Sequence, residues 1–530
     1  MTLTTLLIRI AFVAILFTIL SYLDKILKSF RKDDEILEGS TLEEEIISAE
    51  KNGNKIINTN SLLMTFLQHF CGVLFVFSGM VKAVDPLGTA YKMEQYFDEF
   101  YFHFEPTWFG FLAPLFPILS SYAIWFSVFM IVFEIVLGLM LIMGSRTKFT
   151  AWAFLLLVLF FTVLTGFTFL TGYVPSGATF FEFGKWAAYD ANNMKVTDCG
   201  CFGDFIKLVP KTSFLKDIFL LFPAFYFLFR HKDMHQMFNK PIRTGIIGLS
   251  IIGLLLYCFS NFVWDIPGQD FRPFKKGTDV RAVKEAEDNA MAAVQITGWK
   301  LKNNETGEES IVPNKEYMAN YSTKYKGVYK VIDQIKGEPT IKPTKISEFE
   351  IESLDGYDLA EELVQNPEAQ FLIVNYELKG DPIRKTKMVK DSIFNVDTIM
   401  VMDLETNLEK ASLVKSFDRI EEKEVAYVDQ NWDPEYIATH IEKLKPFTEA
   451  AKKTGIPVMM AIGKSDPDAI AEFDKATGLA LRYGMADDIL LKTIVRSNPG
   501  IVLWKDGIIL DKWHINKLPD FSQVQSQYLK

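Results

Sequence analysis

Residues 119–143 read LSSYAIWFSVFMIVFEIVLGLMLIM, an apolar run whose only charged residue is Glu134. A helix of this length crosses about 30 Å of hydrocarbon. Further apolar runs occupy residues 4–22, 62–84, 149–172, 213–229 and 244–263. The pattern predicts an α-helical polytopic membrane bundle.

The composition changes along the chain. The apolar share is 49 % over 530 residues, but the second half is rich in Lys, Glu and Asp. A membrane domain followed by a soluble α/β domain explains this change. The net charge of −10 argues against nucleic-acid binding. We divide the chain into residues 1–60 (first helix and charged cytoplasmic segment), 61–264 (membrane domain), 265–345 (linker and small β-rich region) and 346–530 (soluble domain).

The placement of Lys and Arg predicts the orientation. Basic residues gather at 25–55, 146–148 and 230–243, in alternate connections between the apolar runs. Connections rich in Lys and Arg stay in the cytoplasm. We therefore expect a multi-pass protein in the lipid of the cytoplasmic (inner) membrane, with both termini and everything after residue 263 on the periplasmic side. Residues 85–118 are aromatic and punctuated by prolines, so they are not expected to form one helix.

The loop between the fourth and fifth runs holds two of the four cysteines, in Asp198-Cys199-Gly200-Cys201-Phe202-Gly203-Asp204. Two thiols separated by one glycine can close a small, strained disulfide ring, and strained disulfides exchange readily. Cys199 and Cys201 are therefore candidate redox residues. The alternative is a structural loop with two inert thiols. Asp198 and Asp204 would raise a nearby thiol pKa unless a lysine compensates.

Glu134 lies near the middle of the third run. A carboxyl group inside a membrane is costly and requires a partner or a proton. It could relay protons or bind a quinone carbonyl, or it could form an interhelical hydrogen bond that fixes packing. Lys82 lies at the outer end of the second run and is expected either to extend its ammonium group to the membrane surface or to pair with Asp85, Asp198 or Asp204.

The remaining cysteines differ in depth. Cys258 lies close to the outer end of the sixth run, from which it could exchange with the loop pair. Cys71 lies deeper and is expected to be a small core residue. A metal site at the cysteine pair would need four ligands, and only scattered residues such as His69 and His103 could supply the others. No metal is therefore predicted.

The soluble half alternates between strand and helix patterns. Residues 303–307 predict a hairpin turn. Strands are expected at 371–376 and 456–462, helices at 409–417, 434–454, 466–476 and 487–495, and a final hairpin around 505–507. This alternation predicts a mixed sheet flanked by helices.

Residues 62–230 resemble the DoxX/MauE group of redox-associated membrane proteins. The resemblance rests on Phe77-Ser78-Gly79-Met80-Val81-Lys82-Ala83-Val84-Asp85-Pro86, on the stretch from Glu134 to Gly138, and on the loop motif of residues 198–204. It implies a four-helix membrane core, here with two extra spans, and a role in thiol, disulfide or quinone-linked electron flow.

The end of the chain is similar to a thioredoxin or peroxiredoxin fold. The similarity rests on residues 497–507, SNPGIVLWKDG, and implies a cis bond before Pro499. It also places the redox-active Cys-x-x-Cys after Tyr376, where this chain reads Glu-Leu-Lys-Gly-Asp-Pro. Because no cysteine follows Cys258, this domain is not expected to exchange dithiols by itself.

Two functions follow from these residues. In the first, the protein takes part in thiol, disulfide or quinone-linked electron transfer at the periplasmic face, with Cys199, Cys201 and Glu134 as the reacting groups. In the second, it is a non-catalytic membrane scaffold whose thioredoxin-like domain binds an envelope protein partner. A third candidate function, transport of a small molecule, is supported only by Glu134.

Overall fold

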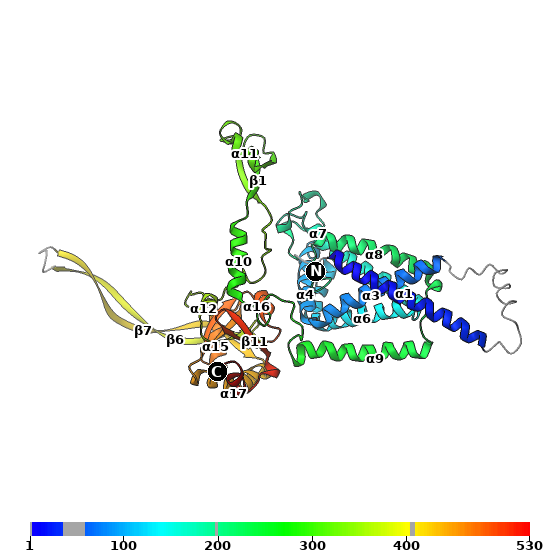
Figure 1. Ribbon diagram of the computed structural model, residues 1–530. Helices are drawn as coiled ribbons and strands as arrows, with labels where there is room; N and C mark the ends of the chain where they lie inside the picture. Colours follow the sequence, from blue (N-terminus) through cyan, green and yellow to red (C-terminus); the bar gives the residue numbers. More distant parts are fainter. Residues whose placement is uncertain (1–2, 35–58, 197–199, 403–408, 530) are drawn as a thin grey trace. The chain divides into compact units, whose positions relative to one another are not determined.

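The computed structural model describes residues 3–34, 59–196, 200–402 and 409–529. The chain divides into two compact units, Met1–Arg272 and Pro273–Lys530. Each unit has its own core, and each is described separately (Figure 1).

The first unit is helical. Its helices are α1 (Leu3–Asp34), α3 (Thr59–Val84), α4 (Pro86–Phe104), α5 (Leu115–Ser121), α6 (Ala123–Met143), α7 (Thr147–Thr171), α8 (Pro210–Arg230) and α9 (Lys240–Phe259). Within the described residues, 6 helices are long and apolar enough to cross a membrane, which supports the multi-pass prediction. Helices α3, α6, α7 and α8 contact one another in a closed ring, whereas α1 packs on α3 and α9 packs on α6 (Figure 1).

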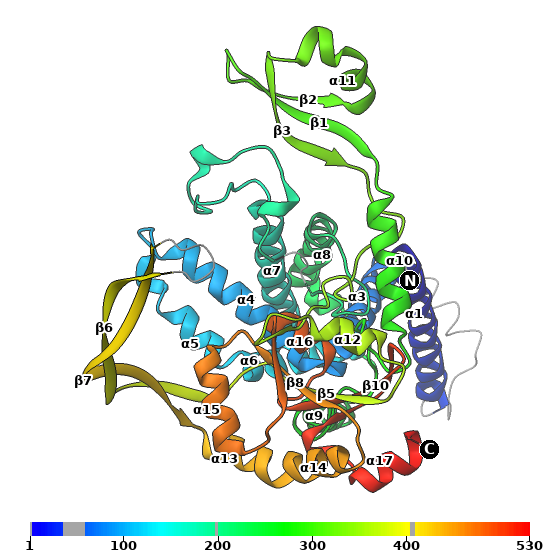
Figure 2. The same cartoon turned by 90° about the vertical axis from the view of Figure 1, so that its left-hand side faces the viewer.

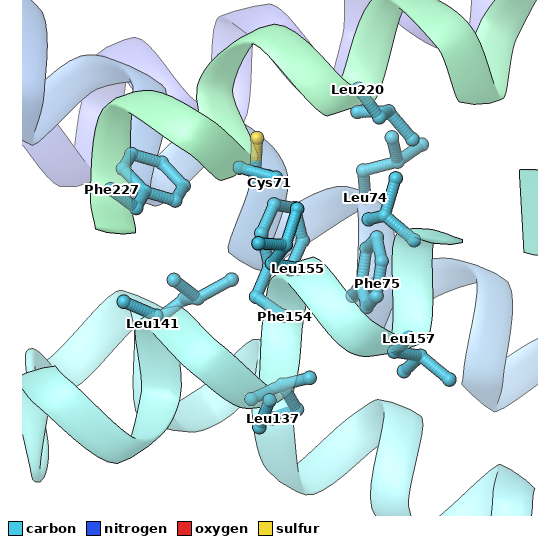
Figure 3. Close-up of a cluster of buried hydrophobic side chains, with 14 of the residues drawn as sticks. Cys71, Leu74, Phe75, Leu137, Leu141, Phe154, Leu155, Leu157, Leu220 and Phe227 are labelled. Atoms are coloured by element: carbon cyan, nitrogen blue, oxygen red, sulfur yellow. The ribbon is translucent and has the colours of Figure 1, made fainter. Parts of the chain in front are cut away.

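The ring contains an apolar core. Figure 3 shows leucine and phenylalanine side chains from all four helices meeting around Cys71. Burial of such side chains contributes about 25 cal/mol per Å² of apolar surface in water, whereas between membrane helices close packing becomes the main attraction. Helices α3 and α6 approach closely where small residues face each other. A Cβ atom added at Gly138 would lie 2.7 Å from the carbonyl oxygen of Gly72.

The segment between the second and third spans differs from a simple loop. It forms α4, whose first turn begins with Pro86, and then the short helix α5. Tyr122 separates α5 from α6, so the third span begins at Ala123 and not at residue 119. The prediction that residues 85–118 are not one helix is confirmed.

The second unit begins with helix α10 (Val280–Ala292), which leads into a small sheet (Figure 2). Its three strands are β1 (Ile296–Asn303), β2 (Glu309–Pro313) and β3 (Tyr329–Lys336), in the order β2-β1-β3. The predicted turn at residues 303–307 joins β1 to β2, with Gly307 at φ +73°. Helix α11 (Asn314–Asn320) packs on β1 and β2.

The main sheet of this unit has six strands in the order β11-β10-β5-β8-β9-β4. They are β4 (Glu352–Ser353), β5 (Gln370–Asn375), β8 (Val458–Gly463), β9 (Arg482–Ala486), β10 (Gly500–Lys505) and β11 (Ile508–His514). Strands β5, β8 and β9 run parallel, while β10, β11 and β4 pair antiparallel. The sheet confirms the predicted mixed sheet and the hairpin around residues 505–507.

Helices cover both faces of this sheet. They are α12 (Leu359–Gln365), α13 (Pro434–Thr439), α14 (Lys445–Lys453), α15 (Pro467–Thr477), α16 (Asp488–Ile494) and α17 (Phe521–Tyr528). All side chains of β5 and β8 are buried, as expected for strands covered on both faces. Phe371 and Ile373 pack against α14, α15 and α17, and α16 contacts the same strands.

The predicted helix at 409–417 is wrong. This segment belongs to β7 (Glu409–Trp432), which pairs with β6 (Gly380–Met402) in a long two-stranded ribbon inserted between β5 and α13 (Figure 1). The pairing is antiparallel along the whole length of both strands, from Gly380 opposite Trp432 to Met402 opposite Glu409. Cross-strand hydrogen bonds, which the local sequence does not reveal, decide the conformation here.

Candidate functional site

The membrane unit contains a buried ion pair between α3 and α6. Lys82 Nζ lies 2.7 Å from Glu134 Oε2, and the two side chains are 8 % and 3 % exposed. Lys82 is buried and pairs with Glu134, so the predictions that it extends to the membrane surface or pairs with Asp85 or Asp204 are wrong, while Asp198 lies outside the described residues. Asp85 instead caps α4 by accepting a hydrogen bond from the Gly88 amide, and Asp204 lies 3.5 Å from Lys207. The Lys82 side chain reaches from α3 to the Glu134 carboxylate and supplies the partner that a buried carboxylate requires.

The cysteine loop sits directly against this ion pair. The hydroxyl group of Ser78 donates a hydrogen bond to the backbone carbonyl of Cys201 (2.8 Å) and accepts one from Lys82 Nζ (3.3 Å). A continuous polar chain therefore runs from Glu134 through Lys82 and Ser78 to the loop. The sequence pattern does not identify Ser78 as a site residue. The available signal is its position one helical turn before Lys82, on the same face of α3.

Two features fix the loop in this place. Phe202 is 2 % exposed and its ring packs 6.1 Å from that of Phe77. Gly200 and Gly203 adopt left-handed backbone conformations, with φ of +60° and +50°, which side chains disfavour. Asp198 and Cys199 lie outside the described residues. Cys201 carries a free thiol, and the small disulfide ring with Cys199 stays a prediction.

A second buried ion pair lies at the start of α8. Lys216 pairs with Asp217, and the two side chains are 15 % and 2 % exposed. Thr165 of α7 donates a hydrogen bond of 3.0 Å to Asp217 Oδ2. Asp217 is buried inside the bundle, whereas Lys216 is partly exposed.

The two ion pairs act on the same thiol. Burial raises the pKa of the Cys201 thiol, and the Asp217 carboxylate raises it further, while the ammonium groups of Lys216 and Lys82 oppose this shift. Cys201 is thus surrounded by fixed charges contributed by α3 and α8. A raised pKa is typical of a buried thiol, and the two ammonium groups are the features here that favour the thiolate.

The other two cysteines are packed in apolar surroundings. Cys71 lies in the core of the four-helix ring, as predicted (Figure 3). Cys258 is 0 % exposed and packs with side chains of α6 in a different cluster from Cys201. The structure does not bring Cys258 together with the loop thiol, so the predicted exchange between them has no support in this geometry.

The histidines considered for metal binding have other partners. The ring nitrogens of His69 lie 3.1 Å from Thr18 Oγ1 and 3.4 Å from Ser21 Oγ, which links α1 to α3. His103 Nδ1 accepts a hydrogen bond from the Phe180 amide. Across the described parts of the chain, no group of three or more His, Cys, Asp or Glu residues is arranged to hold a metal ion.

In the second unit, the peptide bond between Asn498 and Pro499 is cis, the isomer expected from the sequence. It precedes β10, and the Asn498 side chain donates a hydrogen bond to the Glu377 carbonyl just after β5. The β6–β7 ribbon begins at Gly380, so it occupies the chain position at which the thioredoxin resemblance places the redox-active cysteines. Comparisons with models of known families, with curated proteins and with solved structures found no match.

Proposed function

We propose that this protein transfers electrons between thiols and a membrane quinone at the periplasmic face of the inner membrane. The observation that carries the proposal is the hydrogen-bonded chain from Glu134 through Lys82 and Ser78 to the backbone carbonyl of Cys201 in the cysteine loop. Thiol oxidation releases protons as well as electrons, and the buried carboxylate–ammonium pair, which Ser78 links to the backbone carbonyl of Cys201, would take up those protons.

The balanced reaction has two steps. A reduced partner dithiol would reduce the Cys199–Cys201 disulfide, giving the partner disulfide and two loop thiols. The loop thiols would then be oxidised back to the disulfide, and a bound quinone would supply the oxidising power by accepting two electrons and two protons. The described residues assign no holder for the quinone, because Lys82 Nζ already contacts Glu134, Ser78 and the Phe161 ring.

The test is to follow the loop thiols in growing cells. Rapid acid quenching and maleimide labelling, with and without added reductant, should show Cys199 and Cys201 cycling between oxidised and reduced forms. Glu134→Gln should slow reoxidation, whereas Lys185→Met, which alters an exposed pair in the same unit, should not. A loop pair found in one state under all conditions contradicts the proposal. Labelling of intact cells with an impermeant maleimide tests the predicted orientation.

The alternative is a scaffold, and the second unit favours it. The chain has no cysteine after Cys258, and the ribbon stands where a thioredoxin would carry its dithiol. A partner-binding domain needs no thiol, and the described strands β6 and β7 pair only with each other, which leaves the ribbon's outer edges as surfaces to which another strand can pair. If scaffolding is the function, replacing residues 380–432 by a short Gly-Ser linker should abolish function. The double change Cys199→Ser with Cys201→Ser should then preserve function, which is the opposite of the result expected for electron transfer.

A further inference from the structure

The chain between α4 and α6 is uncharged and almost entirely apolar. Residues 106–133, which include α5 and the start of α6, contain no Asp, Glu, Lys, Arg or His. Helix α6 alone has 21 residues, enough to cross about 30 Å of hydrocarbon. The apolar residues that precede α6 are therefore not needed for the crossing, and their apolar surface has to be removed from water in another way.

One side of α5 packs on the membrane unit. The ring centroid of Phe116 lies 5.5 Å from that of Phe100 and 5.3 Å from that of Phe104, both on α4. The Ser127 hydroxyl group of α6 donates a hydrogen bond of 2.8 Å to the Pro86 carbonyl at the start of α4. These contacts hold α5 beside α4 and α6, at the end of the bundle where α6 begins (Figure 2).

The opposite side of α5 and the turn before it are open. Trp108, Phe111, Leu115 and Ile118 are all exposed, and Trp108 is 79 % exposed. The exposed charged side chains of this part of the chain lie on α4 and directly after it, at Asp98 and Glu105. A contiguous apolar surface next to a charged one marks a site that meets a lipid or another protein.

Continuity with α6 decides in favour of lipid. Tyr122 alone separates α5 from α6, and it is followed by the exposed side chains of Ile124, Trp125 and Phe129. Because α6 is long and apolar enough to cross a membrane, its exposed side chains meet lipid, and the open side of α5 continues the same surface. Trp and Tyr side chains favour the boundary between lipid headgroups and hydrocarbon, and Trp108, Tyr122 and Trp125 all lie on this surface.

We propose that residues 108–122 form a lipid-binding anchor, which lies along the membrane surface in the leaflet where α6 begins. Trp108 and the open side of α5 enter the boundary between headgroups and acyl chains, to a depth of about 5–10 Å, while α4 carries the charged side chains towards water. The occupant of this surface is phospholipid and not a second protein chain. The contact does not involve the cysteine loop, so it is independent of the proposed electron transfer.

The test measures what surrounds three equally exposed positions of the full chain. Phe111 in the proposed anchor is 73 % exposed, Leu249 in the apolar helix α9 is 74 % exposed, and Tyr357 in the second unit is 73 % exposed. Each is changed to cysteine in turn, labelled with a nitroxide and reconstituted in vesicles of phosphatidylcholine and phosphatidylglycerol. The native cysteines are first removed by Cys71→Ala, Cys199→Ser, Cys201→Ser and Cys258→Ala.

Power-saturation spectroscopy then compares collisions of the nitroxide with oxygen, which concentrates in lipid, and with a water-soluble nickel complex. The ratio of oxygen to nickel collisions at Phe111 should resemble that at Leu249 and exceed that at Tyr357 roughly threefold or more. A ratio at Phe111 equal to that at Tyr357 would place the surface in water. Few collisions with either reagent would mean that protein covers it. Either result overturns the proposal.

Tryptophan fluorescence gives a second measurement that needs no change of cysteine. In vesicles of brominated phosphatidylcholine, Trp108→Phe should lower the quenched fraction of the total emission, because it removes a fluorophore in contact with lipid. Trp299→Phe is the matched control, because Trp299 lies in the small sheet of the second unit, where its ring packs on Tyr317, and this change should not lower the quenched fraction. Equal quenched fractions in Trp108→Phe and Trp299→Phe overturn the proposal, even if the cysteine-free chain does not fold.

Discussion

Lys82 on α3 and Glu134 on α6 lie 52 residues apart in the sequence, yet their charged atoms are 2.7 Å apart inside the bundle. Each is almost fully buried, so each is the principal neutralising charge of the other. The same lysine contacts Ser78, which holds the cysteine loop. The pair therefore links helix packing to the position of the candidate redox loop.

Glu134→Gln should destabilise the membrane unit strongly, because it leaves the Lys82 ammonium group buried without a counter-charge. Breaking a buried pair by removing one partner costs about 3–5 kcal/mol. The double change Lys82→Met with Glu134→Leu should recover most of this loss, since it removes both charges. Thermal unfolding of the purified protein in one detergent measures both effects. A melting temperature of Glu134→Gln equal to that of the unmodified protein would show that the pair does not stabilise the bundle.

Gly138→Ala should weaken the contact between α3 and α6. The added Cβ would lie 2.7 Å from the Gly72 carbonyl oxygen and 2.9 Å from the Val76 amide nitrogen, both backbone atoms that cannot move independently. Overpacking of this kind costs about 1–3 kcal/mol. Gly248→Ala is the control, because a Cβ at Gly248 in α9 meets nothing within 4 Å. Thermal unfolding should show a lower melting temperature for Gly138→Ala and no loss for Gly248→Ala. The opposite order would place the close helix contact elsewhere.

The three described cysteines should differ in reactivity. Cys71 and Cys258 are each 0 % exposed, whereas Cys201 is half-buried in a loop. In a Cys199→Ser background, a bulky maleimide should label Cys201 first, with labelling of the other two roughly tenfold or more slower until the protein is denatured in SDS. Mass spectrometry of tryptic peptides identifies the labelled residue. Rapid labelling of Cys71 would mean that the core of the four-helix ring opens readily.

The stability of the second unit should depend on pH through His440. Burial lowers the pKa of His440 to about 4, against an ordinary value of 6.5. Because the unfolded chain binds this proton more readily, the stability present above pH 6.5 is lost as the pH falls towards 4. Between pH 7 and pH 5 the loss from this group is about 2 kcal/mol.

His440→Phe should remove this part of the pH dependence, because a phenylalanine ring fits between Tyr436 and Phe473 and takes up no proton. Hydrogen–deuterium exchange of the β8 amides at the two pH values, corrected for the intrinsic exchange rate, measures the difference. An identical loss of protection in both proteins would contradict the assignment to His440. If protection instead rises as the pH falls, the predicted sign of the pH dependence is wrong.

The sequence by itself determined the number and approximate position of the apolar spans, because twenty consecutive apolar residues have few stable conformations other than a membrane or core helix. It also placed Glu134 within a span, located the hairpin turns at residues 303–307 and 505–507, and predicted the buried strands near Phe371 and Met459. These features depend on local composition and periodicity, which a single chain displays directly.

Only the tertiary structure decided which charges meet. Lys82 has several acidic residues nearby in the sequence, but helix packing between α3 and α6 gives it Glu134. Asp217 meets Thr165 because α8 packs beside α7. The β6–β7 ribbon likewise forms through pairing between strands, against a local pattern at residues 409–417 that suggested a helix. Contacts between distant segments depend on how whole helices and strands pack. The hydrophobic periodicity of a single segment does not predict them.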